Sequence, residues 1–498
     1  MDCHRFLNKG GEAGVFCTLL FSVNNVMNRS TFYFCCLPLS LLLVACAPGH
    51  DTAASLNQQI PAAKIDTGLA AGQWPKDSWW EDFHDPELNK LITKALADAP
   101  DMTIARQRIA LAEAQAKMAM AADGPEVNFS ADAERQKMSA EGLMGPFAIT
   151  DPAAGTTGPW YTNGTFGLTA GWDLDLWGKN RAQVEARIGK VNAQQAELQQ
   201  TRQLLASSVA RLYWDWQTQA AIGHLLTAIK QEQLKIIGTD RELYQHGITS
   251  SVEGVETDIS ASKTDERLAE VKGKMKAIEA RLAALTNSPT VKLTPHALPT
   301  VESNLPSTLG YELLARRPDL HEAHWYIEAS LHEVDAAKAA FYPDVNLMAF
   351  LQQDALHLSD LFRSSAQQMG VTAGLTLPIF DSGRLNANLD IAQAQSNLSI
   401  AHYNKAVVEA VNQVTRCASD VETLMAKNKH QQRVEADAAR VVALAQARFN
   451  AGIVAGSRVS EARIPALQEQ LAGIALQGQY VDATLQLTSA LGGGYHHG

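Results

Sequence analysis

Long apolar runs are absent from this 498-residue sequence, although 46% of its residues are hydrophobic. A helix that spans a bilayer needs about 18 or more consecutive apolar residues. Any segment of this chain that crosses a membrane is therefore expected to do so as β-strands. Clusters of Lys and Arg are also absent, and the net charge is -11, which argues against nucleic acid as a partner.

Cysteine is almost absent beyond the first 46 residues, where Cys417 stands alone. This distribution excludes a disulfide framework, and Cys417 is expected to be a small packed residue in a helix. The histidines His321, His324 and His332 lack the spacing of an HExxH site, so we expect a solvated helix face and no metal. No nucleophile–base pair, phosphate loop or carboxylate pair stands out, and we expect neither enzymatic activity nor a cofactor.

Proline is absent from residues 178–288, a stretch of 111 residues. The stretch opens with apolar residues at every seventh position, which predicts a coiled-coil seam. A single helix over residues 178–246 would be roughly 100 Å long, which suits a structure that bridges two membranes. A dimeric structural coiled coil is the alternative, but it leaves the predicted strands unexplained. The seam residues are Val184, Val191, Leu198, Leu205 and Leu212, with Ile188, Val209 and Trp216 at the companion position.

The two halves of the chain repeat one pattern. Residues 166–181 and 369–384 both alternate apolar residues with small or polar ones, then pass through a glycine-containing turn into a helical pattern. The first half has 15 extra residues, within a loop-like stretch at 138–164. We therefore expect a mainly α-helical chain with two structural repeats, each starting with a helix. They are residues 86–300, with a hairpin at 126–176 and long helices at 178–286, and residues 301–491, with a hairpin at 344–380 and long helices at 383–490.

Four strands are predicted, and they form the small β part. In the first strand, Val127, Phe129 and Ala131 alternate with polar residues, which places one face toward lipid and the other toward a lumen. Four strands cannot close a barrel, and unpaired strand edges are not tolerated in hydrocarbon. Several chains must therefore share one barrel, and three chains would supply twelve strands. The predicted strands are residues 126–136, 165–176, 345–352 and 370–379.

Residues 27–45 carry the features of a lipoprotein signal peptide. Arg29 precedes an apolar stretch, and the segment ends in Leu-Val-Ala followed by Cys46. We expect Cys46 to carry the lipid. Ala47, in place of Asp, favours the outer membrane. A plain cleavage site followed by a chance cysteine is the alternative.

Three further segments lie outside the repeats. Residues 1–26 precede the signal, and we expect translation to begin at Met27, which would make them a mis-assigned extension. Residues 46–85 have no apolar period and are expected to form an extended segment. Residues 492–498 are expected to form a flexible tail.

Several motifs resemble the TolC/OprM outer-membrane factors. They are LLARRPDL at 313–320, AAFYPDVNL at 339–347 and LTLPIFDSGRLNANL at 375–389, and the similarity extends over residues 27–495. The resemblance implies a homotrimeric channel-tunnel, with a β-barrel in the outer membrane and a coiled-coil α-barrel in the periplasm. It also implies the exit channel of a tripartite pump for drugs or small toxic solutes, fed by an inner-membrane transporter through a periplasmic membrane-fusion adaptor. An exit duct for type I protein secretion is the alternative, because it uses the same architecture.

The same resemblance suggests where an adaptor docks. The family's tip motif has a glycine between two long helices, followed by residues that meet the adaptor. Glycine tolerates the positive φ of such a turn. The alternative is that these glycines only end helices. The candidate docking residues are Gly247, Ile248 and Thr249 in the first half and Gly452, Ile453 and Val454 in the second.

A gate is expected close to these tips. Glu256 and Glu461 each follow a tip glycine by nine residues, and Glu253 lies one turn closer to the tip. In a trimer, such carboxylates would form rings that attract cations. Arg458 stands where the family pattern often has an acid, so it could instead pair with a neighbouring helix and latch a closed state. The alternative is that these four residues are solvated on the outer wall.

Overall fold

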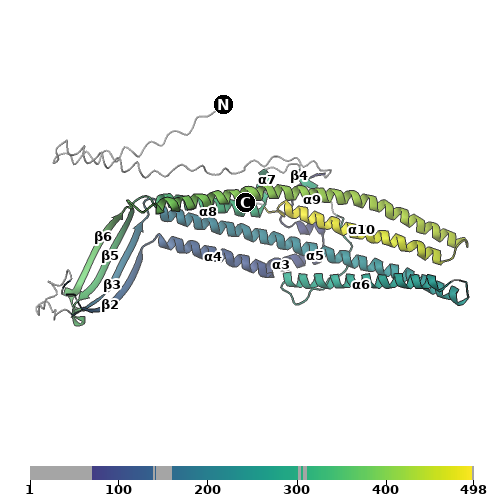
Figure 1. Cartoon of the computed structure of the whole chain (residues 1–498), viewed down its shortest axis with the longest axis horizontal. Helices are drawn as coiled ribbons and strands as arrows, with labels where there is room; N and C mark the ends of the chain where they lie inside the picture. The colour runs from purple at the N-terminus through teal and green to yellow at the C-terminus, as the bar shows by residue number, and fades with distance from the viewer. Residues whose placement is uncertain are drawn as a thin grey trace, which may run out of the picture.

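The computed structural model describes residues 70–137, 139, 141, 160–248, 250–300, 304–306 and 311–495. The chain is elongated, with a small sheet at one end and the turns between long helices at the other (Figure 1). The first half contains β1 (Ala70–Gly72), the 3-10 helix η2 (Trp79–Phe83), α3 (Pro86–Asp98), α4 (Pro100–Ala122), β2 (Glu126–Lys137), β3 (Trp160–Leu174), α5 (Lys179–Gln245) and α6 (Ser251–Leu285). The second half contains β4 (Asn304–Pro306), α7 (Tyr311–Arg316), α8 (Pro318–Ala339), β5 (Asp344–Ala355), η3 (Leu358–Asp360), η4 (Ser364–Ala366), β6 (Gln367–Thr376), α9 (Arg384–Asn450) and α10 (Ser457–Ala490).

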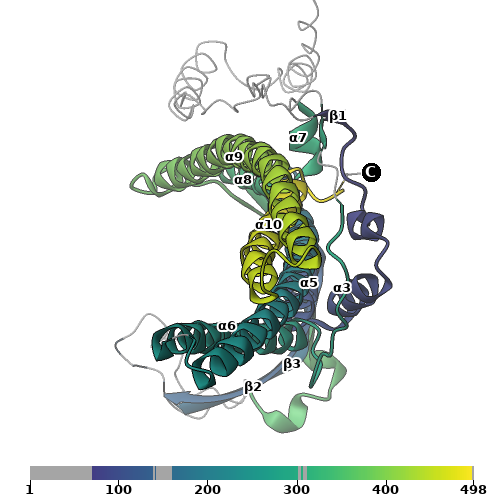
Figure 2. The same ribbon diagram turned by 90° about the vertical axis from the view of Figure 1, so that its right-hand side faces the viewer.

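The two halves have matching elements, which confirms the predicted repeat. Helices α5 and α9 have 67 residues each, and α6 and α10 have 35 and 34. At about 1.5 Å per residue, α5 is roughly 100 Å long, as expected. Neighbouring helices follow the order α4, α5, α8, α9 near the sheet and α6, α5, α10, α9 toward the tips. Seen end-on, the tip helices form an arc with α3 on its convex side (Figure 2).

The sheet is antiparallel throughout, in the order β2-β3-β5-β6. Its register places apolar residues together on one face, where Phe129, Leu168, Leu351 and Met369 form one row across all four strands. The adjacent row, on the other face, is Ser130, Gly167, Gln352 and Gln368. The alternation predicted for the strands is therefore confirmed.

Strand boundaries differ from the prediction by one to five residues, and two of the differences have a clear cause. Strand β3 begins at Trp160, because its pairing with β2 continues as far as Lys137, so residues 160–164 are strand and not loop. Strand β6 ends at Thr376, two residues before Pro378. Proline has no N–H to donate to a strand ladder, which explains why the strand does not continue to residue 379.

The seam predicted along the start of α5 is wrong in part. Val184 and Val191 are only half-buried, whereas the smallest side chains of this segment are buried beside α8. A Cβ on Gly189 would lie 3.0 Å from the Ala329 Cβ. The two helices therefore approach closely through an alanine–glycine seam, which we define as Ala186, Gly189, Ala193 and Ala196. Farther along α5 the predicted residues Leu205, Val209 and Trp216 are buried.

Residues 70–85 were expected to be extended, and this is wrong. Strand β1 pairs in parallel with β4, and Trp79 and Trp80 are buried in a core with α3 and α5. Asp85 begins α3, because its side chain accepts hydrogen bonds from the backbone N–H groups of Glu87 and Leu88. Burial of the two tryptophans fixes a segment that has no apolar period of its own.

The expected flexible tail is also wrong for residues 492–495. Gly492, Gly493 and Gly494 are buried, with φ of 100°, 54° and 83°. A Cβ on Gly492 would lie 1.9 Å from the Arg316 carbonyl oxygen, and one on Gly494 would lie 1.9 Å from the Lys76 carbonyl oxygen. Only glycine combines this backbone conformation with such close contacts. Residues 496–498 lie outside the described part.

Other expectations have mixed outcomes. Cys417 is packed in the core as predicted, and burial raises the pKa of its thiol. The solvated face expected for the histidines is wrong for His321, whose ring packs edge-on against Tyr495 at 5.6 Å. The signal peptide, residues 1–26 and Cys46 lie outside the described residues. Among the helices that the structure does describe, none is both long enough and apolar enough to cross a membrane.

Candidate functional site at the helix tips

The turn between α5 and α6 has the geometry of a Schellman motif. Gly247 has a φ of 69°, and its N–H donates to the Tyr244 carbonyl at 2.9 Å. The N–H of Ile248 reaches back to the Leu243 carbonyl, also at 2.9 Å. These two bonds satisfy carbonyls that the helix end would otherwise leave unpaired.

The turn between α9 and α10 repeats this geometry. Gly452 has a φ of 70° and donates to the Phe449 carbonyl, and Ile453 donates to the Arg448 carbonyl, both at 2.9 Å. A Cβ on either tip glycine would meet nothing within 4 Å. The backbone conformation, and not lack of space, therefore requires glycine at both positions. The predicted turns are confirmed, whereas docking at them stays a prediction.

The tips expose large apolar side chains. Ile248 is 70% exposed and Ile453 is 71% exposed, while Val454 is half-buried. Thr249 lies outside the described residues. Because exposed apolar side chains at a protein's end are typical of a contact surface, Ile248 and Ile453 are the tip residues best suited to meet another protein.

The candidate gate residues are distributed over α6 and α10. Glu256 and Glu461 are exposed, and Arg458 donates from Nη1 to Glu461 Oε2 at 2.6 Å. Arg458 and Glu461 are three residues apart on α10, so among the described residues Arg458 pairs along its own helix. Such an exposed pair contributes little stability. Glu253 belongs to α6, but its side chain lies outside the described part.

A residue that the sequence analysis missed joins the two halves near the tips. Glu232 of α5 is 8% exposed, and its carboxylate accepts a hydrogen bond from the Ser460 hydroxyl of α10 at 2.7 Å. It also accepts one from Lys235 Nζ at 2.7 Å, and Arg463 Nη1 of α10 lies 3.4 Å from Oε1. We call these four residues the Glu232 network. The signal for it was available, because Glu232 shares a helix face with Ile229 and Ile236, where a buried carboxylate needs partners.

The network keeps Glu232 ionised. Burial alone would raise its pKa, but hydrogen bonds from Lys235 and Ser460, with the charges of Lys235 and Arg463, hold it below the ordinary value of 4.5. The stabilisation from this lowered pKa is fully present above pH 4.5 and is lost as the pH falls through the lowered value. The α5–α10 link is therefore complete at neutral pH.

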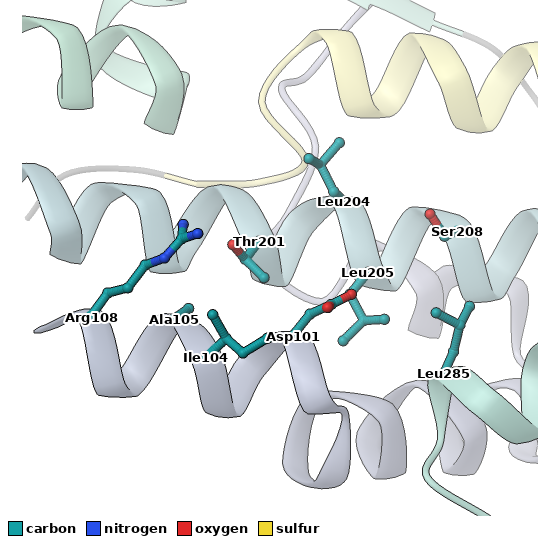
Figure 3. Close-up of a pocket in the computed structure, with 9 residues that line it drawn as sticks. All are labelled: Asp101, Ile104, Ala105, Arg108, Thr201, Leu204, Leu205, Ser208 and Leu285. Atoms are coloured by element: carbon teal, nitrogen blue, oxygen red, sulfur yellow. The ribbon is translucent and has the colours of Figure 1, made fainter.

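Two grooves follow α5, next to its core residues Leu205 and Trp214. One, of about 340 Å³, lies between α4 and α5, and in Figure 3 Arg108 extends from α4 toward α5 at one end of it. A second, of about 630 Å³, continues between α5 and α10 and shares Ser208 and Leu285 with the first. Both grooves mix apolar and charged residues.

The paired helical hairpins, the small sheet with an apolar face and the two glycine tips define the class of outer-membrane channel proteins. Residues 91–288 and 309–493 match the family described as outer membrane efflux protein. The chain belongs to this family.

Similar proteins support the assignment to this family. The chain is 70% identical over 476 residues to multidrug resistance outer membrane protein MdtQ of Escherichia coli O157:H7, with 94% of this chain and 100% of that protein covered. It is 37% identical over 453 residues to MdtP of Escherichia coli O6:H1, with 88% and 91% covered. The structure of outer membrane protein VceC of Vibrio cholerae is similar with a TM-score of 0.71 at 27% identity, covering 84% of this chain and 99% of that one.

Proposed function

We propose that this outer-membrane efflux protein is the exit channel of a tripartite pump that expels drugs or other small toxic solutes. The observation that carries the proposal is the identity of 70% to a relative named for multidrug resistance, along the whole length of that relative. An inner-membrane transporter and a periplasmic membrane-fusion adaptor are the partners that this role requires. The exposed tip residues Ile248 and Ile453 support docking of the adaptor at the turns.

Deleting the gene tests this role against protein secretion, the second function that suits the architecture. We expect the deletion strain to become more susceptible to some members of a panel of toxic compounds and to recover when the gene is restored. The secreted proteome, compared in the same strains, should not change. A change confined to secreted proteins would overturn the proposal.

The proposed channel is a homotrimer, and the free edges of the chain support this. Helices α4 and α9 stand at the two ends of the helix row, and strands β2 and β6 at the two ends of the sheet. Both end helices expose apolar residues seven positions apart, as helices that meet in a coiled coil do. These residues are Ile104, Leu111 and Met118 on α4, exposed by 52%, 61% and 71%, and Ile391 and Leu398 on α9, exposed by 62% and 55%. A second copy suits these edges, because it would bring an α9 stripe to an α4 stripe and a β6 edge to a β2 edge.

Leu111→Asp is expected to prevent trimer assembly, because it would place a carboxylate inside an apolar contact between copies. Leu204→Asp is the matched control, since Leu204 is 50% exposed on the groove side of α5, away from both edges. Size-exclusion chromatography with light scattering on purified protein should give trimers for the control and smaller species for Leu111→Asp. Trimers in both variants would argue against the α4 stripe as a contact between copies.

Lipid attachment at Cys46 is part of the same proposal. An acyl chain there would hold the N-terminal segment at the outer membrane, in addition to the sheet. Cys46→Ser is expected to abolish incorporation of labelled fatty acid while the protein stays in the membrane fraction. Labelling that persists in the variant would place the lipid on another residue.

A further inference from the structure

A line of polar residues follows one side of α5 between α4 and α8. Farther along α5, another side of the helix packs against Trp79, Trp80 and α3, and α3 lies on the convex side of the arc (Figure 2). Successive residues of the polar line are three or four positions apart, which keeps them on one helix face. The line includes Lys190, Gln194, Glu197 and Thr201. In the proposed channel the concave side of the arc is the inner wall, and we assign the line to this wall.

Side chains of α4 and α8 meet this line. Lys190 forms an ion pair of 2.6 Å with Glu333 of α8, and the Gln194 amide donates to the Tyr326 hydroxyl of α8 at 3.1 Å. One helical turn on, Glu197 is paired with Arg108 of α4.

Glu322 lies on α8 one turn before Tyr326 and is half-buried. Within the described residues, its carboxyl forms no ion pair or hydrogen bond. Burial, the charge of Glu197 and the charge of Asp319 together raise the pKa of Glu322 to about 7, and Arg108 opposes them.

The other charged and titratable groups nearby are already engaged. Asp319 forms two hydrogen bonds with Arg317, at 3.0 and 2.7 Å. On α8 itself, His321 packs against Tyr495, and His324 lies against Tyr403 of α9 with ring centroids 6.4 Å apart. Glu197 is therefore the carboxylate from a neighbouring helix that faces Glu322, and Arg108 is the cation that both carboxylates share.

We propose that Glu322, with Glu197 and Arg108, forms a pH-dependent charge on the inner wall that makes the channel prefer cations more strongly as the pH rises through neutrality. With Glu322 protonated, Arg108 balances Glu197 and the group has no net charge. With Glu322 ionised, each copy carries one net negative charge, and a trimer carries three at one level of the wall. Negative charge on a narrow wall concentrates cations and excludes anions. The inference rests on the proposed channel function and on trimer assembly.

Reversal potentials across planar bilayers, measured with the purified full-length channel under a KCl gradient at pH 6 and pH 8, test this inference. Glu322 should change from about one tenth to about nine tenths ionised over this range. The wild-type ratio of potassium to chloride permeability is expected to rise roughly twofold. In the Glu322→Gln variant, the permeability ratio at pH 6 and at pH 8 should equal the wild-type ratio at pH 6. Glu328→Gln is the matched control, because it makes the same change on the same helix but outside this group. Its permeability ratio should change with pH as in wild type.

The outcomes separate the inference from the function that it rests on. A pH-dependent ratio that Glu322→Gln removes and Glu328→Gln leaves unchanged supports the inference. The same pH dependence in wild type and Glu322→Gln would overturn it, and so would a wild-type ratio that does not change with pH. Absence of any current through assembled wild-type protein would instead count against the channel itself.

Discussion

Glu232→Ala is expected to open the tip end of the channel. The substitution removes the group that Ser460, Lys235 and Arg463 all contact, so α5 and α10 lose their shared polar link. The Ser460 hydroxyl, 6% exposed, would also lose the carboxylate that it donates to. The expected cost is about 1–3 kcal/mol, because Lys235 and Arg463 are partly exposed and can be rehydrated. A loss of this size, repeated in three copies, should shift the tips toward an open state.

Single-channel conductance measures this opening, and susceptibility to a large antibiotic that the outer membrane normally excludes checks it in cells. Both should increase in Glu232→Ala. Lys230→Gln is the matched control, since it breaks an ion pair with Asp265 between α5 and α6 in which both side chains are partly exposed. Arg458→Ala, which breaks only an exposed pair along α10, should increase conductance less. Conductance of Glu232→Ala equal to that of wild type would show that the network does not hold the tips together.

The double variant Ile248→Asp, Ile453→Asp is expected to lose transport while its trimers remain. Both side chains are exposed at the tips, so a carboxylate is solvated in the free protein and should not disturb folding. In contact with an adaptor, the same carboxylates would be buried without a partner, and this cost disfavours docking. Susceptibility to toxic compounds should approach that of the deletion strain.

Crosslinking in cells from introduced tip cysteines shows directly whether the adaptor is lost. The matched control is Ile248→Leu, Ile453→Leu, which keeps two exposed apolar side chains of similar size and should preserve both capture and resistance. If the double Asp variant captured the adaptor and transported at the wild-type level, Ile248 and Ile453 would have no role in docking.

Most of the fold could be predicted because periodicity and glycine placement are local properties. The alternating residues of the four strands and the proline-free stretch determined the strands and the long helices to within a few residues. The repeated glycines Gly247 and Gly452 marked both turns, since the positive φ they require is a constraint within a few residues of chain.

The parts that the sequence did not predict depend on contacts between distant segments. Trp79 and Trp80 are fixed by α5, more than 120 positions later, so no local period marks them. Residues 492–494 have the glycine-rich composition of a flexible tail, but they pack against residues from both halves. The helix face of Glu232 indicates that its carboxylate needs partners, but it does not identify Ser460, which lies 228 positions away. The roles of Gly247, Ile248, Glu256 and Glu461 in docking and gating stay predictions.

The alanine–glycine seam between α5 and α8 limits where this molecule can deform. Its side chains have no alternative rotamers, and even a methyl group at Gly189 would crowd Ala329. Two helices locked at this spacing cannot slide or rotate past each other without separating outright. The half of the molecule next to the sheet should then be stiff. Any bending is left to the distal half, where the Glu232 network and the Lys230–Asp265 pair join the helices beside a small apolar cluster.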